Sequence, residues 1–163
     1  MRLSLLALLA TATVLITGCT NPPDYPDEPV IAYEGLSRLF MNEGLSLSDS
    51  VVLTLSFTDG DGDIGFRQTA QETNVFVEDL RDGFVRTYRL PDVPQRGVAN
   101  GISGTIDLTL YTTCCYVDGF VPCSPDVPEG TTNELRFEVY IVDRAGNESN
   151  RIQTEAITLF CGQ

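Results

Sequence analysis

Histidine, tryptophan and lysine are all missing from this sequence of 163 residues. Histidine is the commonest general base of enzymes and the commonest protein ligand of transition metals, so Ser-His and Cys-His catalytic pairs are excluded. No serine lies in a Gly-x-Ser-x-Gly segment, which would present a nucleophile on a sharp turn. A pair of carboxylates can hydrolyse a glycoside, but a chain without tryptophan lacks an obvious platform for a sugar ring. We therefore predict that the protein is not an enzyme.

Positive charge is also scarce. The chain has 10 arginines against 23 aspartates and glutamates, which gives a formal net charge of −13 at pH 7. Nucleic acids are bound through clustered cations, and anionic lipid headgroups attract basic segments. The composition therefore excludes nucleic acid as an expected partner. It also argues against docking of the folded part onto anionic headgroups.

One long apolar run lies at the N-terminus. Arg2 supplies a positive start, Leu3 to Ile16 carry no charge, and a small residue, Gly18, precedes Cys19. These features are typical of a secretory signal, and the run is shorter than the about 20 apolar residues that span a bilayer. The Ile-Thr-Gly-Cys ending resembles the lipobox of bacterial lipoproteins, which implies cleavage after Gly18 and acylation of Cys19. An ordinary signal followed by a chance cysteine is the alternative.

This interpretation divides the chain into three segments. We predict a lipoprotein signal peptide over residues 1–18, a lipidated Cys19 with an acidic, proline-rich tether over residues 19–29, and a folded domain over residues 30–163. Residues 20–29 contain four prolines and three acids, a composition that stays extended and repels itself. Removing Arg2 with the signal leaves a net charge of 9 − 23 = −14 on the mature chain. The lipid is then the expected attachment to the membrane.

Beyond the tether, short runs of alternating apolar and polar residues are separated by clusters of Gly, Pro, Asp and Asn. Alternation with a period of two is the signature of half-buried strands, and no convincing helical periodicity accompanies it. We predict an all-β fold, an antiparallel immunoglobulin-like β-sandwich of about seven strands behind a flexible N-terminal tether. The expected strands are Val30–Leu36, Val51–Thr58, Asn74–Leu80, Phe84–Leu90, Ile106–Tyr111, Leu135–Val142 and Ile152–Phe160.

Four cysteines follow Cys19, and an even number in an exported chain favours two disulfides. A zinc site is the alternative, although adjacent cysteines fit poorly with the C-x₂-C spacing of zinc ligands. Side-chain parity along the preceding strands puts Cys114 and Cys161 on inward faces, so we predict the pairs Cys114–Cys161 and Cys115–Cys123. A bond between the adjacent Cys114 and Cys115 would be strained. The expected role of both bonds is to staple a small domain.

Asp59-Gly60-Asp61-Gly62-Asp63 is the sharpest local motif of the sequence. Three carboxylates at alternating positions, with glycines that let the backbone curl, suit a hard cation such as Ca²⁺, which takes six to eight oxygen ligands. The motif is not an EF-hand, because the sixth and twelfth positions of that loop correspond here to Ile64 and Ala70. The alternative is a solvated acidic turn.

A fourth carboxylate is expected beside this motif. If the strands Val51–Thr58 and Leu135–Val142 face each other across the sandwich, the loops that follow them emerge at the same end. That places Asp143, together with Asn147, next to the three aspartates. We therefore predict a Ca²⁺ site formed by Asp59, Asp61, Asp63 and Asp143. Arg144 could instead neutralise the cluster by itself.

Several of these segments also carry a resemblance to a known group. Thr54–Gly65, Ile102–Ile106, the double cysteine and Tyr140–Ser149, in this order, are similar to segments of small lipoproteins of the Bacteroidetes. Val-Asp-Arg-Ala-Gly-Asn separately resembles the last hairpin of many bacterial Ig-like surface domains. The resemblance implies a lipid-anchored outer-membrane location and an Ig-like fold, and acids soon after Cys19 resemble signals for display at the cell surface.

The expected function is a non-enzymatic binding or accessory domain, anchored to the outer membrane by its lipid. Two alternatives remain at this point. One is a structural subunit of an outer-membrane transport or protein-export complex. The other is a carbohydrate-binding module, for which the partner would be a glycan.

Overall fold

The computed structural model describes residues 24–45, 47–66, 72–93 and 101–162. The predicted signal peptide, Cys19 and the first part of the tether lie outside these residues. The described chain consists of strands in three sheets and contains no helix, so the prediction of an all-β protein is confirmed. Within the same ranges, no helix offers the length and hydropathy that crossing a bilayer requires.

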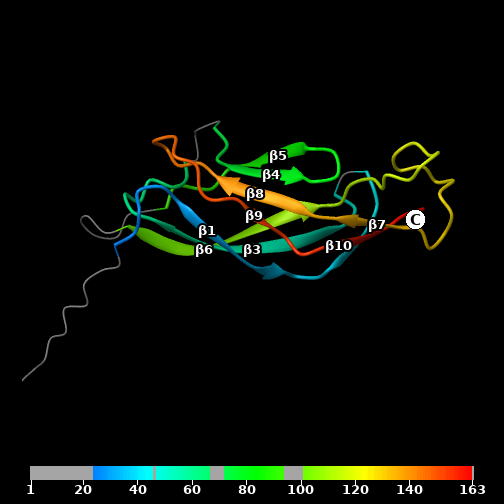
Figure 1. The fold of residues 1–163 in the computed structure, drawn as a ribbon, viewed down its shortest axis with the longest axis horizontal. Helices are drawn as coiled ribbons and strands as arrows, with labels where there is room; N and C mark the ends of the chain where they lie inside the picture. The colour runs from blue at the N-terminus through cyan, green and yellow to red at the C-terminus, as the bar shows by residue number, and fades with distance from the viewer. Residues whose placement is uncertain (1–23, 46, 67–71, 94–100, 163) are drawn as a thin grey trace, which may run out of the picture.

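The strands, in chain order, are β1 (Val30–Leu36), β2 (Phe40–Asn42), β3 (Ser50–Asp59), β4 (Val75–Asp79), β5 (Phe84–Tyr88), β6 (Ile102–Tyr111), β7 (Thr132–Leu135), β8 (Phe137–Ile141), β9 (Ile152–Gln153) and β10 (Ile157–Phe160). One sheet has the order β1-β3-β6 and another the order β5-β4-β8-β9, and every pairing in them is antiparallel. They form the lower and upper layers in Figure 1. A third sheet, β2-β10-β7, lies toward the end that holds the C-terminus, and its β2–β10 pairing is parallel.

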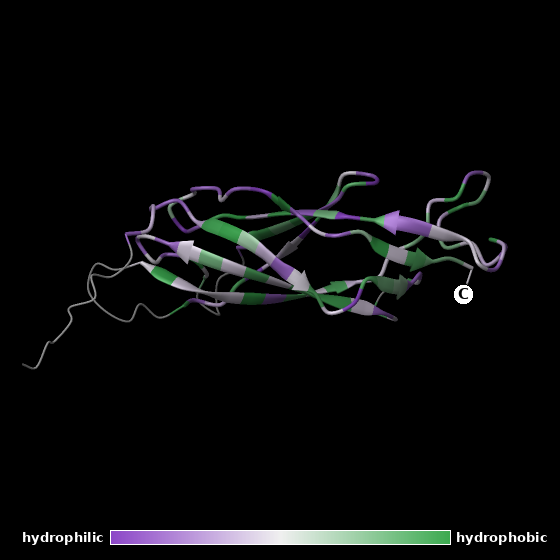
Figure 2. Cartoon of the chain, turned by 60° about the horizontal axis from the view of Figure 1, so that its bottom comes forward, coloured by the Kyte–Doolittle hydropathy of each residue, from purple (hydrophilic) through white to green (hydrophobic). Residues whose placement is uncertain are grey.

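The core lies between the layers because the strands keep their alternation. On β3, Val51, Leu53 and Leu55 are at most 1 % exposed, while the residues between them are half-buried. On β8, the inward residues Phe137 and Val139 are fully buried. Figure 2 shows this alternation as green bands separated by paler ones along the strands. Each fully buried aliphatic side chain contributes about 1.5–3 kcal/mol relative to an exposed one, so the alternation fixes which face of each strand is inward.

Two expected strands are each divided in the structure. Leu135–Val142 becomes β7 and β8, with Arg136 between them, and Ile152–Phe160 becomes β9 and β10. The divisions lie opposite each other, because the amide of Phe137 donates to the Thr154 hydroxyl at 3.1 Å instead of to a strand carbonyl. Here the chain passes from the sheet β5-β4-β8-β9 to the sheet β2-β10-β7. Strand β2 was not expected from the sequence.

The four cysteines form two disulfides, but with other partners than the predicted ones. Cys114 is bonded to Cys123 and Cys115 to Cys161, so the predicted pairs are wrong. The error has a structural cause. Strand β6 ends at Tyr111, and beyond it the alternation is lost, so that Cys115, at 2 % exposed, takes the inward position rather than Cys114. Parity holds along a strand and does not carry through the residues after its end.

Candidate metal centre

Two aspartates occupy core-facing positions at the same end of the molecule. On β3 the inward series Leu53, Leu55 and Phe57 continues to Asp59, which is 0 % exposed. The inward series of β8 continues beyond the strand to Asp143, which is 3 % exposed. One residue comes from each main layer, so two carboxylates close the sandwich where apolar side chains would otherwise stand. An aspartate is almost never buried this deeply without a compensating partner.

The loop after β3 turns back toward these two side chains. Gly62 and Gly65 have φ values of +71° and +87°, a left-handed backbone conformation that residues other than glycine seldom adopt. Ile64 is 1 % exposed and anchors the loop in the core, and its amide donates to Asp59 Oδ2 at 3.2 Å. The loop is therefore anchored in the core at Ile64, while Asp61 stays exposed.

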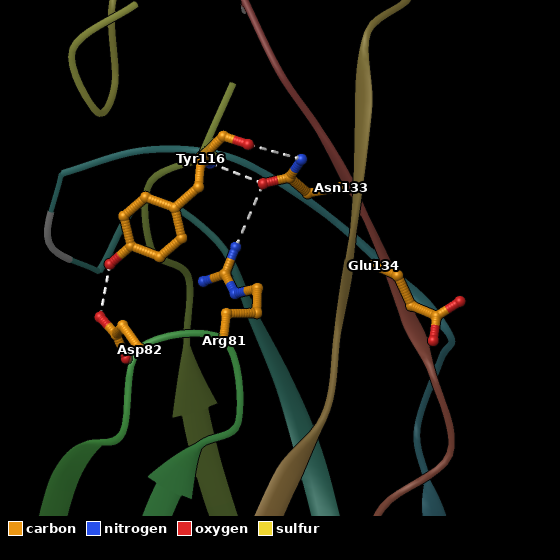
Figure 3. A pocket seen from close by; sticks show the side chains of 5 residues that line it. All are labelled: Arg81, Asp82, Tyr116, Asn133 and Glu134. Atoms are coloured by element: carbon orange, nitrogen blue, oxygen red, sulfur yellow. Dashed lines mark hydrogen bonds between the residues drawn. The ribbon is translucent and has the colours of Figure 1, made fainter. Parts of the chain in front are cut away.

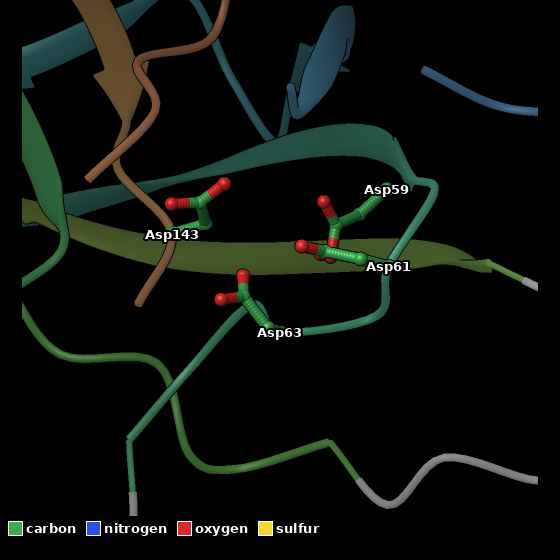
Figure 4. Close-up of side chains that lie close together, drawn as sticks. All are labelled: Asp59, Asp61, Asp63 and Asp143. Carbon is green, nitrogen blue, oxygen red and sulfur yellow. The ribbon is translucent and has the colours of Figure 1, made fainter. Parts of the chain in front are cut away.

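The four predicted ligands come together in the structure. Asp59, Asp61, Asp63 and Asp143 each offer a carboxylate oxygen, and these oxygens lie within 4.8 Å of one another. Figure 4 shows the four side chains pointing toward a common centre, Asp59 from the end of β3, Asp61 and Asp63 from the loop that follows, and Asp143 from the loop after β8. The sequence-based expectation that Asp143 approaches the acidic loop is thus confirmed.

A hairpin turn fixes the position of Asp143. The backbone amide of Asn147 donates to Asp143 Oδ1 and its side-chain amide donates to Oδ2, both at 2.8 Å. Gly146, with φ of +92°, allows the turn. Asn147 therefore orients the carboxylate of Asp143, and each carboxylate oxygen retains a lone pair for another ligand.

The guanidinium of Arg144 forms its hydrogen bonds outside the cluster. Its Nη1 donates to Asp92 Oδ1 and to the carbonyl of Gly65, both at 2.9 Å. The backbone amide of Arg144 does bond to the cluster, where it donates to Asp63 Oδ1 at 3.3 Å. Among the described residues, no ion pair joins an arginine to Asp59, Asp63 or Asp143.

The carboxylate of Asp59 is the least satisfied group of the cluster. Its Oδ1 is buried and has no hydrogen-bond partner among the described residues. Burial raises the pKa of the Asp59 carboxyl to about 6, the amide of Ile64 lowers it in part, and the charge of Asp61 raises it further. Burial also raises the pKa of Asp63, the charges of Asp143 and Asp61 add to the effect, and the backbone amide and charge of Arg144 oppose it in part. Both shifts show that burial and the neighbouring carboxylates disfavour the charged forms of these two side chains.

The opposite end of the molecule provides an internal comparison. Asp79 also continues an inward series, that of β4, and is 3 % exposed. Here Arg81 supplies the compensation, because its Nε lies 3.0 Å from Asp79 Oδ1 and its Nη2 lies 2.7 Å from Oδ2. The chain therefore matches one buried aspartate with an arginine and leaves the other, Asp59, without a protein cation among the described residues.

Arg81 also explains the shallow depression drawn in Figure 3. Arg81, Asp82, Tyr116, Asn133 and Glu134 line it. The Arg81 guanidinium lies 4.8 Å from the centre of the Tyr116 ring and donates to Asn133, and Asn133 in turn binds the Tyr116 backbone. These groups form hydrogen bonds with one another and connect the disulfide loop, which the Cys114–Cys123 bond closes, to the β4–β5 turn. The depression is a structural junction.

Two further surface features stand out. One is a groove between β5, β6 and the loop after β2. It is lined in part by Leu45 and Leu47, which are 78 % and 67 % exposed, and nothing in the structure shows what covers it.

The other lies on the outer face of the sheet β5-β4-β8-β9. Here the rings of Phe76 and Tyr140 stack at 4.7 Å, and the Arg151 guanidinium lies 3.9 Å from the centre of the Tyr140 ring. By strand order these two neighbours cover opposite faces of Tyr140, which leaves that ring no face for a sugar.

The four carboxylates suit a hard divalent cation. Carboxylate oxygens are the ligands that Ca²⁺ prefers, and its flexible coordination tolerates a loop of this kind, with backbone carbonyls or water filling the remaining positions. Mg²⁺ demands a tighter octahedral shell and gives up water reluctantly. With neither histidine nor a free cysteine in the cluster, the donor set is a poor match for zinc or copper.

Sequence reasoning found these four residues but missed why two of them matter most. The signal was available, since Asp59 and Asp143 stand at even spacings from the inward residues Phe57 and Ile141. Asp79 and Arg81 were missed altogether. The chain matches no known family model, no curated protein and no solved structure, so its relationships give no support to any assignment of the site.

Proposed function

We propose that this protein is a non-enzymatic, lipid-anchored binding or accessory domain of the outer membrane, and that a Ca²⁺ ion closes one end of its sandwich. The fold in this proposal is of the immunoglobulin type. The sheet orders β1-β3-β6 and β5-β4-β8-β9, and the parallel pairing of an early strand with the last one, support that assignment. Cys19 is the proposed site of lipidation.

The observation that carries the calcium proposal is the state of Asp59. This carboxylate is fully buried, one of its oxygens has no partner among the described residues, and three more carboxylates converge on it. Moving several like charges out of water is costly unless a cation compensates them. An ion that binds only the folded protein converts this cost into a dependence of stability on calcium.

The test is calcium binding by the mature chain. Isothermal titration is expected to give one Ca²⁺ per chain for the wild type and weaker binding of Mg²⁺. Asp61→Asn removes one charge from an exposed member of the cluster and is expected to weaken Ca²⁺ binding at least tenfold, by analogy with other ligand losses. Asp118→Asn, an exposed aspartate in the disulfide loop, is the matched control and should bind like the wild type.

Two results would contradict the proposal. A wild-type protein that takes up no Ca²⁺ at millimolar concentration leaves the cluster as a destabilising structural feature. Equal affinities for wild type and Asp61→Asn would place the ion elsewhere in the chain.

The membrane-associated part of the proposal needs its own measurement. Fractionation of cells should recover the protein in outer-membrane fractions, and intact-cell protease treatment should show whether the domain faces outward. Phe76 and Arg151 pack against the ring of Tyr140, so this ring gives no support to a glycan-binding role, and a carbohydrate function is not part of the proposal.

A further inference from the structure

The acidic tether touches the loop that carries the aspartate cluster. The amide of Gly60, the residue directly after Asp59, donates to the carbonyl of Pro26 at 2.7 Å. The two backbones meet without a side chain between them, because a Cβ on Gly60 would collide with the carbonyls of Tyr25 and Pro26. The last tether residues and the cluster therefore share one short piece of backbone.

The start of β1 is held in a different way. Pro29 is buried, and the amide and carbonyl of Ile31 form hydrogen bonds with the Asn150 side chain at 2.8 and 2.9 Å. These contacts involve neither the acidic loop nor its carboxylates. The domain can thus keep β1 in place while residues 24–28 leave the surface, so the contact with Gly60 behaves as a separate latch.

Charge makes this latch sensitive to a cation. Asp24, Asp27 and Glu28 are exposed acids on the segment that docks beside the four aspartates. Like charges within a Debye length of about 8–10 Å repel each other, and the repulsion grows when they are partly buried. A divalent cation in the cluster removes two of the negative charges and stiffens the loop that offers the Gly60 amide.

We propose that Ca²⁺ in the aspartate cluster latches the tether onto the domain through the contact between Gly60 and Pro26. This inference rests on the proposed calcium site. Its consequence is mechanical: the ion sets whether the tether is fixed to the domain from Pro26 onward or only from Pro29 onward. Calcium would thereby control the length of free tether between the anchor and the domain.

The first experiment observes the tether directly. The mature chain carrying Cys19→Ser, which removes only the site of the acyl anchor, is labelled with ¹⁵N, and heteronuclear NOE values are recorded for Asp24, Tyr25, Asp27 and Glu28. In chelator these values should be those of a flexible segment, and saturating Ca²⁺ should raise them toward the values of β1. Values that are the same with and without Ca²⁺, in a protein that binds the ion, would overturn the inference and leave the calcium site intact.

The second experiment uses the reciprocity of coupled equilibria. If Ca²⁺ favours the latched tether by some factor, then a latched tether favours Ca²⁺ by the same factor, roughly 5-fold or more for a typical coupling. Gly60→Ala places a methyl group against the Tyr25 and Pro26 carbonyls, and Gly60 does not have the positive φ that would strain an alanine. It should release the tether in Ca²⁺ and raise the Kd for Ca²⁺ by that factor, although no ligand has been removed. An unchanged Kd would contradict the coupling.

A charge variant keeps the test decisive if Gly60→Ala does not fold. Replacing Asp24 and Asp27 by Asn and Glu28 by Gln removes the repulsion without touching the latch or the ligands. This variant should show an ordered tether at a lower Ca²⁺ concentration than the wild type, and partly in chelator. A tether that stays equally mobile in the variant would refute the electrostatic part of the inference. Failure of the wild type to bind Ca²⁺ would instead refute the proposed function.

Discussion

Replacing Asp59 by asparagine should stabilise the protein when calcium is absent, which is unusual for a substitution at a fully buried position. The pKa of Asp59 is raised from 3.8 to about 6 in the folded chain, mainly by burial. A rise of this size corresponds to about 3 kcal/mol between the charged and neutral forms. At pH 7 the wild type carries this penalty, whereas the side chain of the Asp59→Asn variant is neutral and nearly the same size. The Ile64 amide would still find a carbonyl acceptor.

The assay is thermal unfolding in chelator and in Ca²⁺. In chelator, Asp59→Asn should melt roughly 6–12 °C above the wild type, which is the shift that about 3 kcal/mol produces in a domain of this size. Calcium at a hundredfold excess over its Kd adds about 2.7 kcal/mol to the wild type. It should leave the variant almost unmoved, so the two melting curves separate in chelator and nearly coincide in calcium.

The matched control is Asp79→Asn at the other end of the molecule. Asp79 is just as deeply buried but pairs with Arg81, so the variant leaves a buried guanidinium unmatched and should lose about 3–5 kcal/mol in both conditions. If Asp59→Asn also melts below the wild type in chelator, then a protein group already compensates Asp59 and the reasoning fails. If Ca²⁺ raises the melting point of the variant as much as that of the wild type, the ion does not use Asp59.

Three other results are expected. In chelator, the free energy of unfolding should rise as pH falls from 7 to 5, because the pKa of Asp59 is about 6 in the folded chain and lower in the unfolded one. In millimolar Ca²⁺ the free energy of unfolding should fall over the same range, since protons compete with the ion. Denaturant titrations at several pH values would check both signs. Replacing both cysteines of the Cys115–Cys161 bond, which spans 46 residues, by alanine should lower the free energy of unfolding by about 4 kcal/mol. The same change at the Cys114–Cys123 bond, which spans 9 residues, should lower it by about 2.5 kcal/mol. Urea unfolding of the two variants measures both losses, and the reverse order would show that loop length does not govern stability. Cys19→Ala should release the protein from membranes or leave it unprocessed, and a variant still cleaved after Gly18 and still membrane-bound on fractionation would contradict the lipid anchor.

Much of the fold could be predicted because strand periodicity is a local signal. Leu53 and Leu55 on β3, and Phe137 and Val139 on β8, alternate with polar neighbours, and burial follows that pattern directly. The breaks within the last strands were not predictable in the same way. They depend on the bond between the Phe137 amide and the Thr154 hydroxyl, which joins segments that are distant in the chain.

The four residues of the candidate site could also be predicted from the sequence. Asp59, Asp61 and Asp63 form a motif within five residues, and simple sandwich topology was enough to bring Asp143 to them. The cysteine pairing failed because it extended strand parity past the end of β6. The latch between Gly60 and Pro26 had no sequence signal, since a glycine in an acidic loop is equally typical of an ordinary turn.

The sequence by itself determined the all-β class, the inward faces of the main strands and the chemistry available to the site, because periodicity and composition are properties of neighbouring residues. Only the tertiary structure decided which charges are compensated. Asp79 meets Arg81, whereas Asp59 meets three carboxylates, and the guanidinium of Arg144 binds Asp92. Whether a buried charge needs a cation depends on every group that packs around it, and for Asp59 one of those groups, Asp143, comes from a distant part of the chain.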